Sequence, residues 1–214
     1  MDSLNVYLND RLVGRLTDDG GILAFAYGSE YASDLDNEPL SYSLPLRNEP
    51  FDHAEEVLGG PGIVASFRLL RELSLPASDT LELLRRIIFN FLVGNGDAHG
   101  KNFSVLYHGR KSALAPMYDV MSTAVYPDVS KRMAMKIDGE YSFRWITRGK
   151  FMRMAETLGF SRKTMAKEID RMSSRILGKA PKLAEKLNAG FPSGCYRRIC
   201  EGIVKRASQV MLKQ

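Results

Sequence analysis

The segment GNGDAHGKN at 94–102 directly follows a hydrophobic run, IIFNFLV at 87–93. Turns favour glycine, asparagine and aspartate, so the segment is predicted to be a loop that leaves a buried element. A plain turn does not need a lysine beside Asn102, or Asp97 five residues before that asparagine. The loop is therefore the first candidate for a functional site, and the expected fold is built outward from it.

The sequence before the loop predicts two helices. Residues 63–73 are amphipathic, and Asp79 followed by Glu82 resembles a capping box that opens a second helix. This second helix is expected to run to Val93, where the loop begins. Almost every face of 83–93 is apolar, so the helix should lie deep inside the molecule.

The sequence after the loop predicts a β-hairpin and then more helix. FSVLY at 103–107 and SALAP at 112–116 indicate two short strands around a tight turn, and Asp119 follows the second strand. A further strand is indicated by apolar residues at every second position, Met133, Met135 and Ile137. From about residue 148 the chain is predicted to be helical to its end. Two apolar helical faces mark this region, Met165/Ile169/Met172/Ile176 and Ile199/Ile203/Ala207/Val210.

The N-terminal part predicts a small antiparallel β-meander. Apolar and polar residues alternate over 4–27 and again in LSYSLPL at 40–46. The stretch FDHAEEVLGGPG at 51–62 mixes charge with a glycine-rich cluster, which is typical of a linker or a domain boundary. Because few strands bury little area, the meander is not expected to be stable alone.

The bulk composition favours a soluble globular protein. The chain is 44% hydrophobic and 26% charged. No run approaches the roughly 18 apolar residues needed to span a bilayer, and the N-terminus does not have the layout of a signal peptide. Cys195 and Cys200 have no His/Cys cluster beside them, so a zinc site is not expected. Reduced thiols and a cytoplasmic location without membrane contact are the natural expectation.

The charge is unevenly distributed along the chain. The overall net charge is +5, but residues 1–100 contain seven Arg, no Lys and sixteen Asp plus Glu, a net charge of −9. Residues 101–214 carry a net charge of +14. Solvated helix faces are the commoner explanation of such a basic half. Attraction of a nucleic acid or of an acidic protein is the alternative.

The loop and its surroundings contain the groups that phosphoryl transfer requires. A carboxylate must accept the proton of the attacking hydroxyl, and oxygen ligands must hold Mg²⁺ on the phosphates. The spacing from Asp97 to Asn102 is that of the H-R-D-x-x-x-x-N loop of protein kinases. The predicted hairpin carries the chain back, so Asp119 is expected to meet Asn102 across one metal ion.

Three segments resemble a known family. GNGDAHGKNFSVLY at 94–107 and LAPMYDVMSTAVYP at 114–127 resemble the catalytic core of the HipA-like serine/threonine kinases, the toxins of bacterial toxin–antitoxin pairs. LNVYLNDRLVGRLTDDGGILAFAY at 4–27 is similar to the N-terminal β-subdomain of that family. The resemblance implies an α+β fold in which an incomplete antiparallel β-subdomain is joined to a mostly α-helical, protein-kinase-like C-lobe. The expected boundaries are 1–50 for the subdomain, 51–62 for the linker and 63–214 for the C-lobe.

The resemblance also implies roles and partners. Asp97 would be the general base, while Asn102 and Asp119 would bind Mg²⁺ and, through it, ATP. Lys101 would neutralise charge on the transferred phosphoryl group, and His99 would brace the loop. The implied partners are an antitoxin-like DNA-binding protein, a protein substrate and, indirectly, DNA.

The chain departs from the family between LPLR at 44–47 and GGPG at 59–62. Family members carry in this part a phosphate-covering loop, a strand lysine for the α- and β-phosphates, and a serine that they phosphorylate themselves. No lysine precedes Lys101 in this chain. Because positioning supplies most of the catalysis in phosphoryl transfer, impaired ATP binding and little or no kinase activity are expected.

Two alternatives stay open. In the first, the chain is a module that binds an antitoxin-like partner without catalysis. In the second, residues 151–170 form a helix-turn-helix that binds DNA, with Arg162 and Lys163 placed to meet phosphates.

Overall fold

The computed structural model of the chain contains two compact units, Met1–Gly62 and Ile63–Gln214. The structure describes residues 2–8, 10–19, 22–34, 36–37, 39–40, 46–51, 62–73, 77–108 and 111–212. Within this part of the chain, no helix is both long and apolar enough to cross a bilayer.

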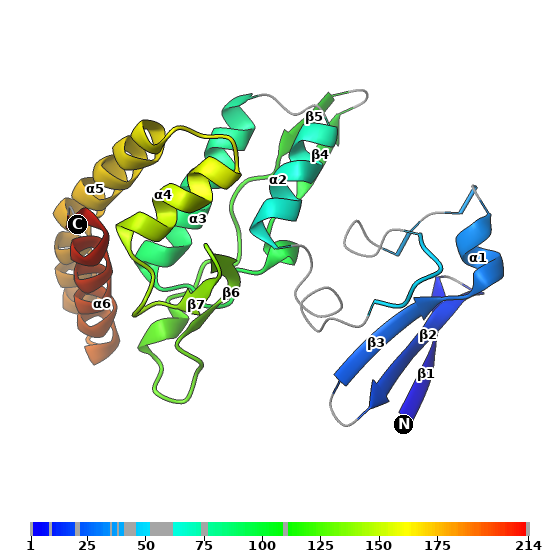
Figure 1. The fold of residues 1–214 in the computed structure, drawn as a ribbon. Coiled ribbons are helices and arrows are strands. Elements are labelled where there is room, and N and C mark those ends of the chain that lie inside the picture. Colours follow the sequence, from blue (N-terminus) through cyan, green and yellow to red (C-terminus); the bar gives the residue numbers. More distant parts are fainter. Residues whose placement is uncertain are drawn as a thin grey trace. The chain divides into compact units, whose positions relative to one another are not determined.

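The N-terminal unit is a three-stranded antiparallel sheet in the order β1–β2–β3 (Figure 1). Its strands and its one-turn helix have these bounds: β1 (Asp2–Leu8), β2 (Arg11–Asp19), β3 (Ile22–Tyr27) and α1 (Ser29–Ser33). The register shifts between Val6 and Tyr7, and Val13 of β2 is skipped in the pairing with β1. The meander predicted over 4–27 is therefore confirmed.

The core of this unit is aromatic. Phe25, Tyr27, Tyr31 and Phe51 are all buried, and the Phe25 and Tyr27 rings meet edge-on at a centroid distance of 4.9 Å. Phe51 forms an isolated antiparallel bridge with Phe25. Phe51 thus belongs to the sheet's core, although the sequence assigned it to the linker. The rest of that linker, apart from Gly62, and most of the strand predicted at 40–46 lie outside the described residues.

The C-terminal unit is mostly helical, which confirms the expected fold class. Its helices are α2 (Ile63–Glu72), α3 (Ala77–Val93), α4 (Arg148–Thr157), α5 (Arg162–Gly190) and α6 (Gly194–Met211). Its two hairpins pair β4 (Val105–His108) with β5 (Lys111–Leu114), and β6 (Arg132–Ile137) with β7 (Glu140–Ser142). Two 3₁₀ turns, η2 (Gly100–Asn102) and η3 (Thr123–Val125), flank the first hairpin.

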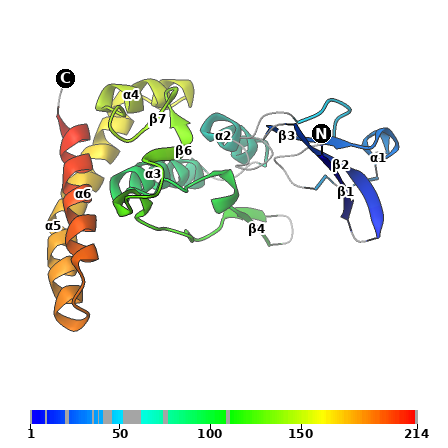
Figure 2. The ribbon, with the colours of Figure 1, turned by 90° about the horizontal axis from the view of Figure 1, so that it is seen from below.

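Helix α3 lies at the centre of this unit, as its apolar faces predicted (Figures 1 and 2). Leu84, Ile88 and Phe91 have no exposed surface. The Phe91 ring meets the rings of Phe143 and Phe151 at centroid distances of 5.9 and 5.3 Å. Full burial of a side chain of this size contributes roughly 1.5–3 kcal/mol, so α3 is a rigid support for the loop that follows it.

The N-terminus of α3 differs from the prediction. The helix begins at Ala77, so Asp79 lies inside its first turn and is not a cap. The Asp79 carboxylate instead accepts a 2.7 Å hydrogen bond from the backbone N–H of Leu114 in β5. Glu82 forms ion pairs along the helix with Arg85 and Arg86. The capping-box prediction was wrong because it weighed local pairing alone, and the carboxylate's partner is 35 residues away.

The C-terminal helices pack as predicted from their apolar faces. Met165 and Ile169 of α5 and Ala207 and Val210 of α6 have no exposed surface. Figures 1 and 2 both show α5 and α6 side by side. Their connection, Phe191 to Ser193, is short, and the Ser193 hydroxyl accepts a hydrogen bond from the Cys195 N–H at the start of α6.

Candidate functional site

The candidate loop begins where α3 ends, at Gly94. This glycine has φ = +75°, a conformation that side chains disfavour. A Cβ atom at this position would lie 2.5 Å from Nη2 of Arg206. Arg206 comes from α6 and donates a 3.0 Å hydrogen bond to the carbonyl of Leu92 in the last turn of α3. Arg206 of α6, more than a hundred residues further along the chain, thus stabilises the turn from α3 into the loop.

Burial dominates the environment of Arg206. Its side chain lies with Cζ 5.6 Å from the centroid of the Phe143 ring, and 8% of the residue is exposed. Burial lowers the pKa of its guanidinium to about 10. The group therefore stays charged at neutral pH. Its Nη2 has no hydrogen-bond partner among the described residues.

Asn95 connects the loop at 94–102 to the segment that contains Asp119. Its side-chain amide nitrogen donates to Oδ1 of Asn90 at 3.0 Å and to the backbone carbonyl of Asp119 at 3.2 Å. Its oxygen accepts the backbone N–H of Asp97 at 3.2 Å. Asn95 is 2% exposed, so these bonds are shielded from water. Sequence reasoning did not single out this residue, although it lies inside the GNGDAHGKN loop between Gly94 and Gly96.

A second connection runs between the loop and η3. The hydroxyl of Thr123 accepts the Gly96 N–H at 2.7 Å, and the Gly96 carbonyl accepts the Ala134 N–H of β6 at 2.8 Å. A Cβ on Gly96 would lie 2.6 Å from the carbonyl oxygen of Arg132. The close approach of the β6 strand therefore explains why a glycine occupies this position.

The structure brings Asn102 and Asp119 together. The Asn102 side-chain amide donates a hydrogen bond to Oδ2 of Asp119 at 2.8 Å, across 17 residues of sequence. The same amide lies 3.5 Å from the carbonyl oxygen of Asp97. Asp119 has φ = +53°, a left-handed conformation that aspartate and asparagine adopt more readily than most residues. The loop, the hairpin and the segment after β5 thus meet at one point.

This cluster has the donor chemistry that suits Mg²⁺. The carboxylate of Asp119 and the carboxamide of Asn102 both offer hard oxygen atoms, and Mg²⁺ characteristically takes one or two such protein ligands while phosphates and waters complete its shell. Asn102 is buried, whereas Asp97, Lys101 and Asp119 are exposed, so the carboxylates face solvent. Among the described residues, no group of three or more His, Cys, Asp and Glu side chains forms a metal-binding cluster. The residues present fit a Mg²⁺ shared with a phosphate ligand better than a closed protein cage.

Lys101 and His99 contribute to the loop through their backbones. The Tyr118 hydroxyl donates to the Lys101 carbonyl at 2.8 Å and lies 2.7 Å from Oγ of Ser104. The His99 N–H donates to the Asp97 carbonyl at 2.8 Å, and the His99 carbonyl accepts the Asn102 N–H at 3.0 Å. The buried Nδ1 of His99 has no hydrogen-bond partner within the described part of the chain. Bracing by the His99 side chain, like charge neutralisation by Lys101, stays a prediction.

The segment of the DNA-binding alternative, residues 151–170, forms two helices joined by a turn. Residues 151–170 include most of α4, a turn with Gly159 at φ = +77°, the Ser161 cap and the start of α5. Arg162 forms a 3.2 Å ion pair with Glu156, and both side chains are at least half exposed. The apolar faces of both helices pack into the core of the unit. The geometry by itself does not assign DNA binding to this segment.

Comparisons with known proteins place these residues in a family context. The family model for the HipA N-terminal domain matches residues 4–87, and the model for the HipA-like C-terminal domain matches residues 46–180. A Sinorhizobium fredii protein named "Putative kinase Y4mE" is 47% identical over 111 residues, 51% of this chain and 24% of that protein. The "Serine/threonine-protein kinase toxin HipA" of Shewanella oneidensis is 31% identical over 110 residues, 51% of this chain and 25% of that protein.

A solved structure shares the fold. It is that of HipA from Shewanella oneidensis, in a complex with HipB and operator DNA. It matches with a TM-score of 0.64 and 23% identity, over 73% of this chain and 37% of that chain. The matches to the two curated relatives span about a quarter of the length of those proteins.

Proposed function

This chain belongs to the HipA-like family, because the model of the HipA-like C-terminal domain matches more than half of it, and we propose that its C-terminal unit is the Mg²⁺-holding half of a serine/threonine kinase centre. The observation that carries the proposal is the 2.8 Å contact between the Asn102 amide and the Asp119 carboxylate. Asp97 is tied to the same cluster through its backbone.

Each residue has a distinct role in this proposal. Asn102 and Asp119 hold Mg²⁺, which when bound would neutralise charge on the phosphates of ATP. Asp97, exposed on the loop, accepts the proton of the attacking serine or threonine hydroxyl. Lys101 follows in the same loop and offers a positive charge to the transferred phosphoryl group.

We also propose that the chain on its own transfers phosphate poorly or not at all. Protein kinases use a lysine on a strand of the N-lobe to orient the α- and β-phosphates. No lysine precedes Lys101 here. A nucleotide would thus be held at its Mg²⁺ end alone, and loss of orientation costs phosphoryl transfer most of its rate.

Metal binding and catalysis need separate tests. Mn²⁺ serves as a spectroscopic substitute for Mg²⁺, and its binding to the purified chain can be followed by electron paramagnetic resonance. Binding that weakens at least about tenfold in Asp119→Asn supports the oxygen-ligand assignment. Radiolabelled ATP with and without a generic protein substrate tests transfer, and turnover that disappears in Asp97→Asn would overturn the proposed inactivity while supporting the role of Asp97.

A partner-binding role is the second candidate, and a surface feature of the N-terminal unit favours it. Tyr7 of β1 and Leu12 of β2 lie opposite each other in the sheet and are 56% and 50% exposed. Adjacent exposed apolar side chains on a small sheet are typical of an interaction surface. We propose that this sheet binds an antitoxin-like DNA-binding protein, through which the chain associates with DNA. The solved relative was crystallised with HipB and operator DNA.

Co-purification tests this second role. The chain is co-expressed with a small DNA-binding protein of the antitoxin type, and Tyr7→Glu/Leu12→Glu is compared with wild type. The variant should lose the partner while the melting temperature stays unchanged. Retention of the partner by the variant would exclude this surface.

A further inference from the structure

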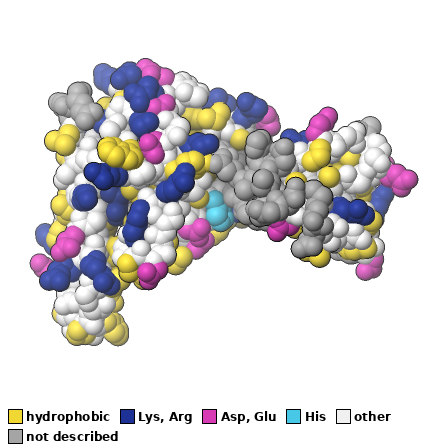
Figure 3. All heavy atoms as spheres, turned by 60° about the horizontal axis from the view of Figure 1, so that its bottom comes forward, with side chains coloured by type: hydrophobic (Ala, Val, Ile, Leu, Met, Phe, Trp, Pro, Cys, Tyr) yellow, Lys and Arg dark blue, Asp and Glu magenta, His cyan; other side chains and the backbone are white. Residues whose placement is uncertain are grey.

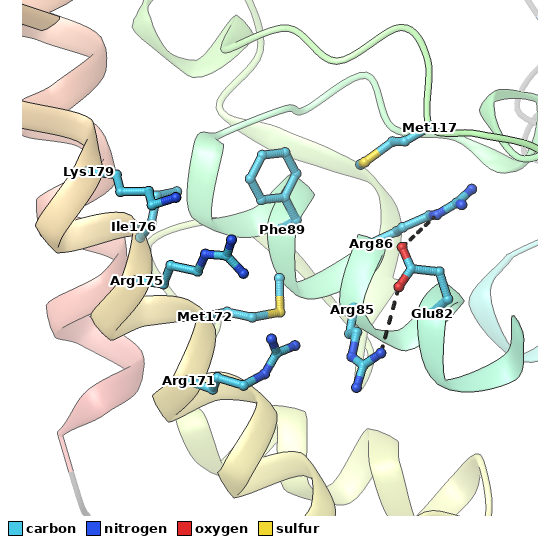
Figure 4. Close-up of a pocket in the computed structure, with 10 residues that line it drawn as sticks. All are labelled: Glu82, Arg85, Arg86, Phe89, Met117, Arg171, Met172, Arg175, Ile176 and Lys179. Carbon is cyan, nitrogen blue, oxygen red and sulfur yellow. Dashed lines mark hydrogen bonds and ion pairs between the residues drawn. The ribbon is translucent and has the colours of Figure 1, made fainter. Parts of the chain in front are cut away.

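A groove of about 500 Å³ opens on the C-terminal unit between α3, α5 and the segment after β5 (Figure 4). Its floor is apolar, with Phe89 from α3 and Met172 and Ile176 from α5, and Met117 lies at the opposite side. Six charged side chains complete the lining, Glu82, Arg85, Arg86, Arg171, Arg175 and Lys179. None of these residues belongs to the loop cluster around Asn102.

The apolar floor continues along α5 beyond the groove. Met165 and Ile169 are fully buried, and Met172 and Ile176 are half-buried where the core ends. The same spacing of three and four residues continues through Ala180 to three exposed side chains. These are Leu183, Leu187 and Phe191, with 56%, 37% and 73% of their surface exposed. The core-facing stripe of α5 therefore extends roughly 20 Å past the part that the rest of the unit covers.

A row of positive charges runs beside this stripe. Arg171, Arg175, Lys179, Lys182 and Lys186 recur every three or four residues, so they lie along one face of α5. All five are exposed. Figure 4 shows the first three pointing along the same side of the helix as the groove. Figure 3 shows Lys and Arg side chains in several separate patches over the helical unit, interspersed with apolar and acidic side chains.

The charges at the inner end of the row are compensated within the protein. Glu168 accepts hydrogen bonds from Arg85 at 3.0 Å and from Arg171 at 2.6 Å, and Glu82 is paired with Arg86. In contrast, the structure gives Arg175 and Lys179 no hydrogen bond or ion pair with any described residue. The uncompensated positive charge thus lies beside the uncovered part of the apolar stripe.

We propose that this face of α5 is a docking site for an amphipathic helix of a protein partner, with acidic residues in a row beside its apolar stripe. Helix-in-groove recognition uses apolar anchors every three or four residues, which matches the spacing on α5. Acidic side chains on the partner would complement Arg175, Lys179 and the lysines after them. A small anion would leave Leu183 and Phe191 uncovered. The phosphate backbone of a nucleic acid would bind the charged row but would not bury the apolar stripe.

A synthetic peptide tests this site directly. The probe is a fluorescent helical peptide of about 20 residues, long enough to span roughly 30 Å. It carries leucine every three or four residues and glutamate in the neighbouring row. Anisotropy titration of the full chain should show binding that weakens with added salt. A peptide of identical composition in scrambled order should bind at least about tenfold more weakly, because it presents no continuous stripe.

Charge reversal on α5 sharpens the test. Arg175→Glu/Lys179→Glu should weaken binding of the acidic peptide at least about tenfold. The same variant should bind a peptide with lysine in place of glutamate better than wild type does. Lys163→Glu/Lys167→Glu is the matched control, since it makes the same change of charge on α5 at residues that do not line the groove. That control should leave the affinity within about twofold of wild type, and circular dichroism checks that each variant is folded.

Several results would overturn the proposal. Equal losses in the two double variants would indicate nonspecific attraction between opposite charges. Equal binding of the scrambled peptide would remove the role of the apolar stripe. Self-association that Leu183→Glu abolishes would assign the face to a second copy of this chain, and binding of duplex DNA or anionic vesicles in place of the peptide would assign it to those ligands. None of these measurements depends on the Mg²⁺ site, so failure here leaves the proposed function untouched.

Discussion

The Asn102 side-chain amide donates a 2.8 Å hydrogen bond to the carboxylate of Asp119, and this contact closes the candidate site. The two residues come from a 3₁₀ turn and from the segment after a hairpin, so they meet because β4 and β5 pair between them. Asn95 fixes the backbone of Asp119 from the other side. Because three separate segments form the site, the contribution of each segment can be tested by its own substitution.

The first prediction concerns the charge on Asp119. Asp119→Asn is expected to weaken Mn²⁺ binding by roughly tenfold to 100-fold, since a neutral amide replaces the anionic ligand. Asparagine tolerates the left-handed backbone at φ = +53°, so the melting temperature should change little. Asp138→Asn is the control, because Asp138 is also left-handed at φ = +48° but lies in the β6–β7 turn. A similar loss of Mn²⁺ affinity in both variants would remove Asp119 from the metal site.

The second prediction concerns the turn that begins the loop. Gly94→Ala should destabilise the protein in two ways, through the left-handed backbone at about 1–2 kcal/mol and through the contact with Arg206 at about 1–3 kcal/mol. Gly139→Ala is the matched comparison, because Gly139 has φ = +76° and open space where the Cβ would lie. Urea denaturation should show the larger loss for Gly94→Ala. Equal losses of unfolding free energy in the two variants would mean that the Arg206 side chain moves aside without destabilising the protein.

The third prediction concerns Glu168 and pH. Hydrogen bonding to Arg85 is the largest cause that lowers the pKa of Glu168 below its usual value of 4.5, and Arg171 adds to it. A carboxyl whose pKa is lower in the folded state stabilises the fold above its unfolded pKa and loses that contribution as the pH falls through its folded pKa. The free energy of unfolding should therefore fall more steeply below pH 4.5 in wild type than in Glu168→Gln. Parallel curves for the two proteins would show that the Glu168 ion pairs contribute nothing.

The fourth prediction concerns the link between α3 and β5. Asp79→Ala leaves the Leu114 N–H without its 2.7 Å acceptor and should cost about 1–3 kcal/mol. Asp79→Asn keeps an acceptor oxygen and should retain more than half of that stability. If alanine and asparagine are equally destabilising, the charge of Asp79 at the start of the helix matters and the hydrogen bond does not.

The sequence predicted most of the secondary structure because the spacing of apolar residues within a short segment reflects whether that segment is a helix or a strand. The alternation in 4–27, the apolar faces of 83–93 and the stripes in α5 and α6 each reflect one face buried against a core. Errors arose where a residue's partner was distant. Asp79 was predicted to be a helix cap, but its partner is the Leu114 N–H in β5. Phe51 was predicted to begin a linker, but it pairs with Phe25 in the sheet. Neither partner can be recognised from the neighbouring residues alone.

The candidate site divides in the same way. The sequence by itself determined the loop, its Asp97–Asn102 spacing and the presence of Asp119 after a hairpin, since these depend on residue types and on short-range turns. Only the tertiary structure decided that Asn102 touches Asp119, that Asn95 joins the two segments, and that Arg206 occupies the space where a side chain at residue 94 would begin. Such contacts depend on how helices and hairpins pack, and packing is set by the whole core at once and not by any single stretch of sequence.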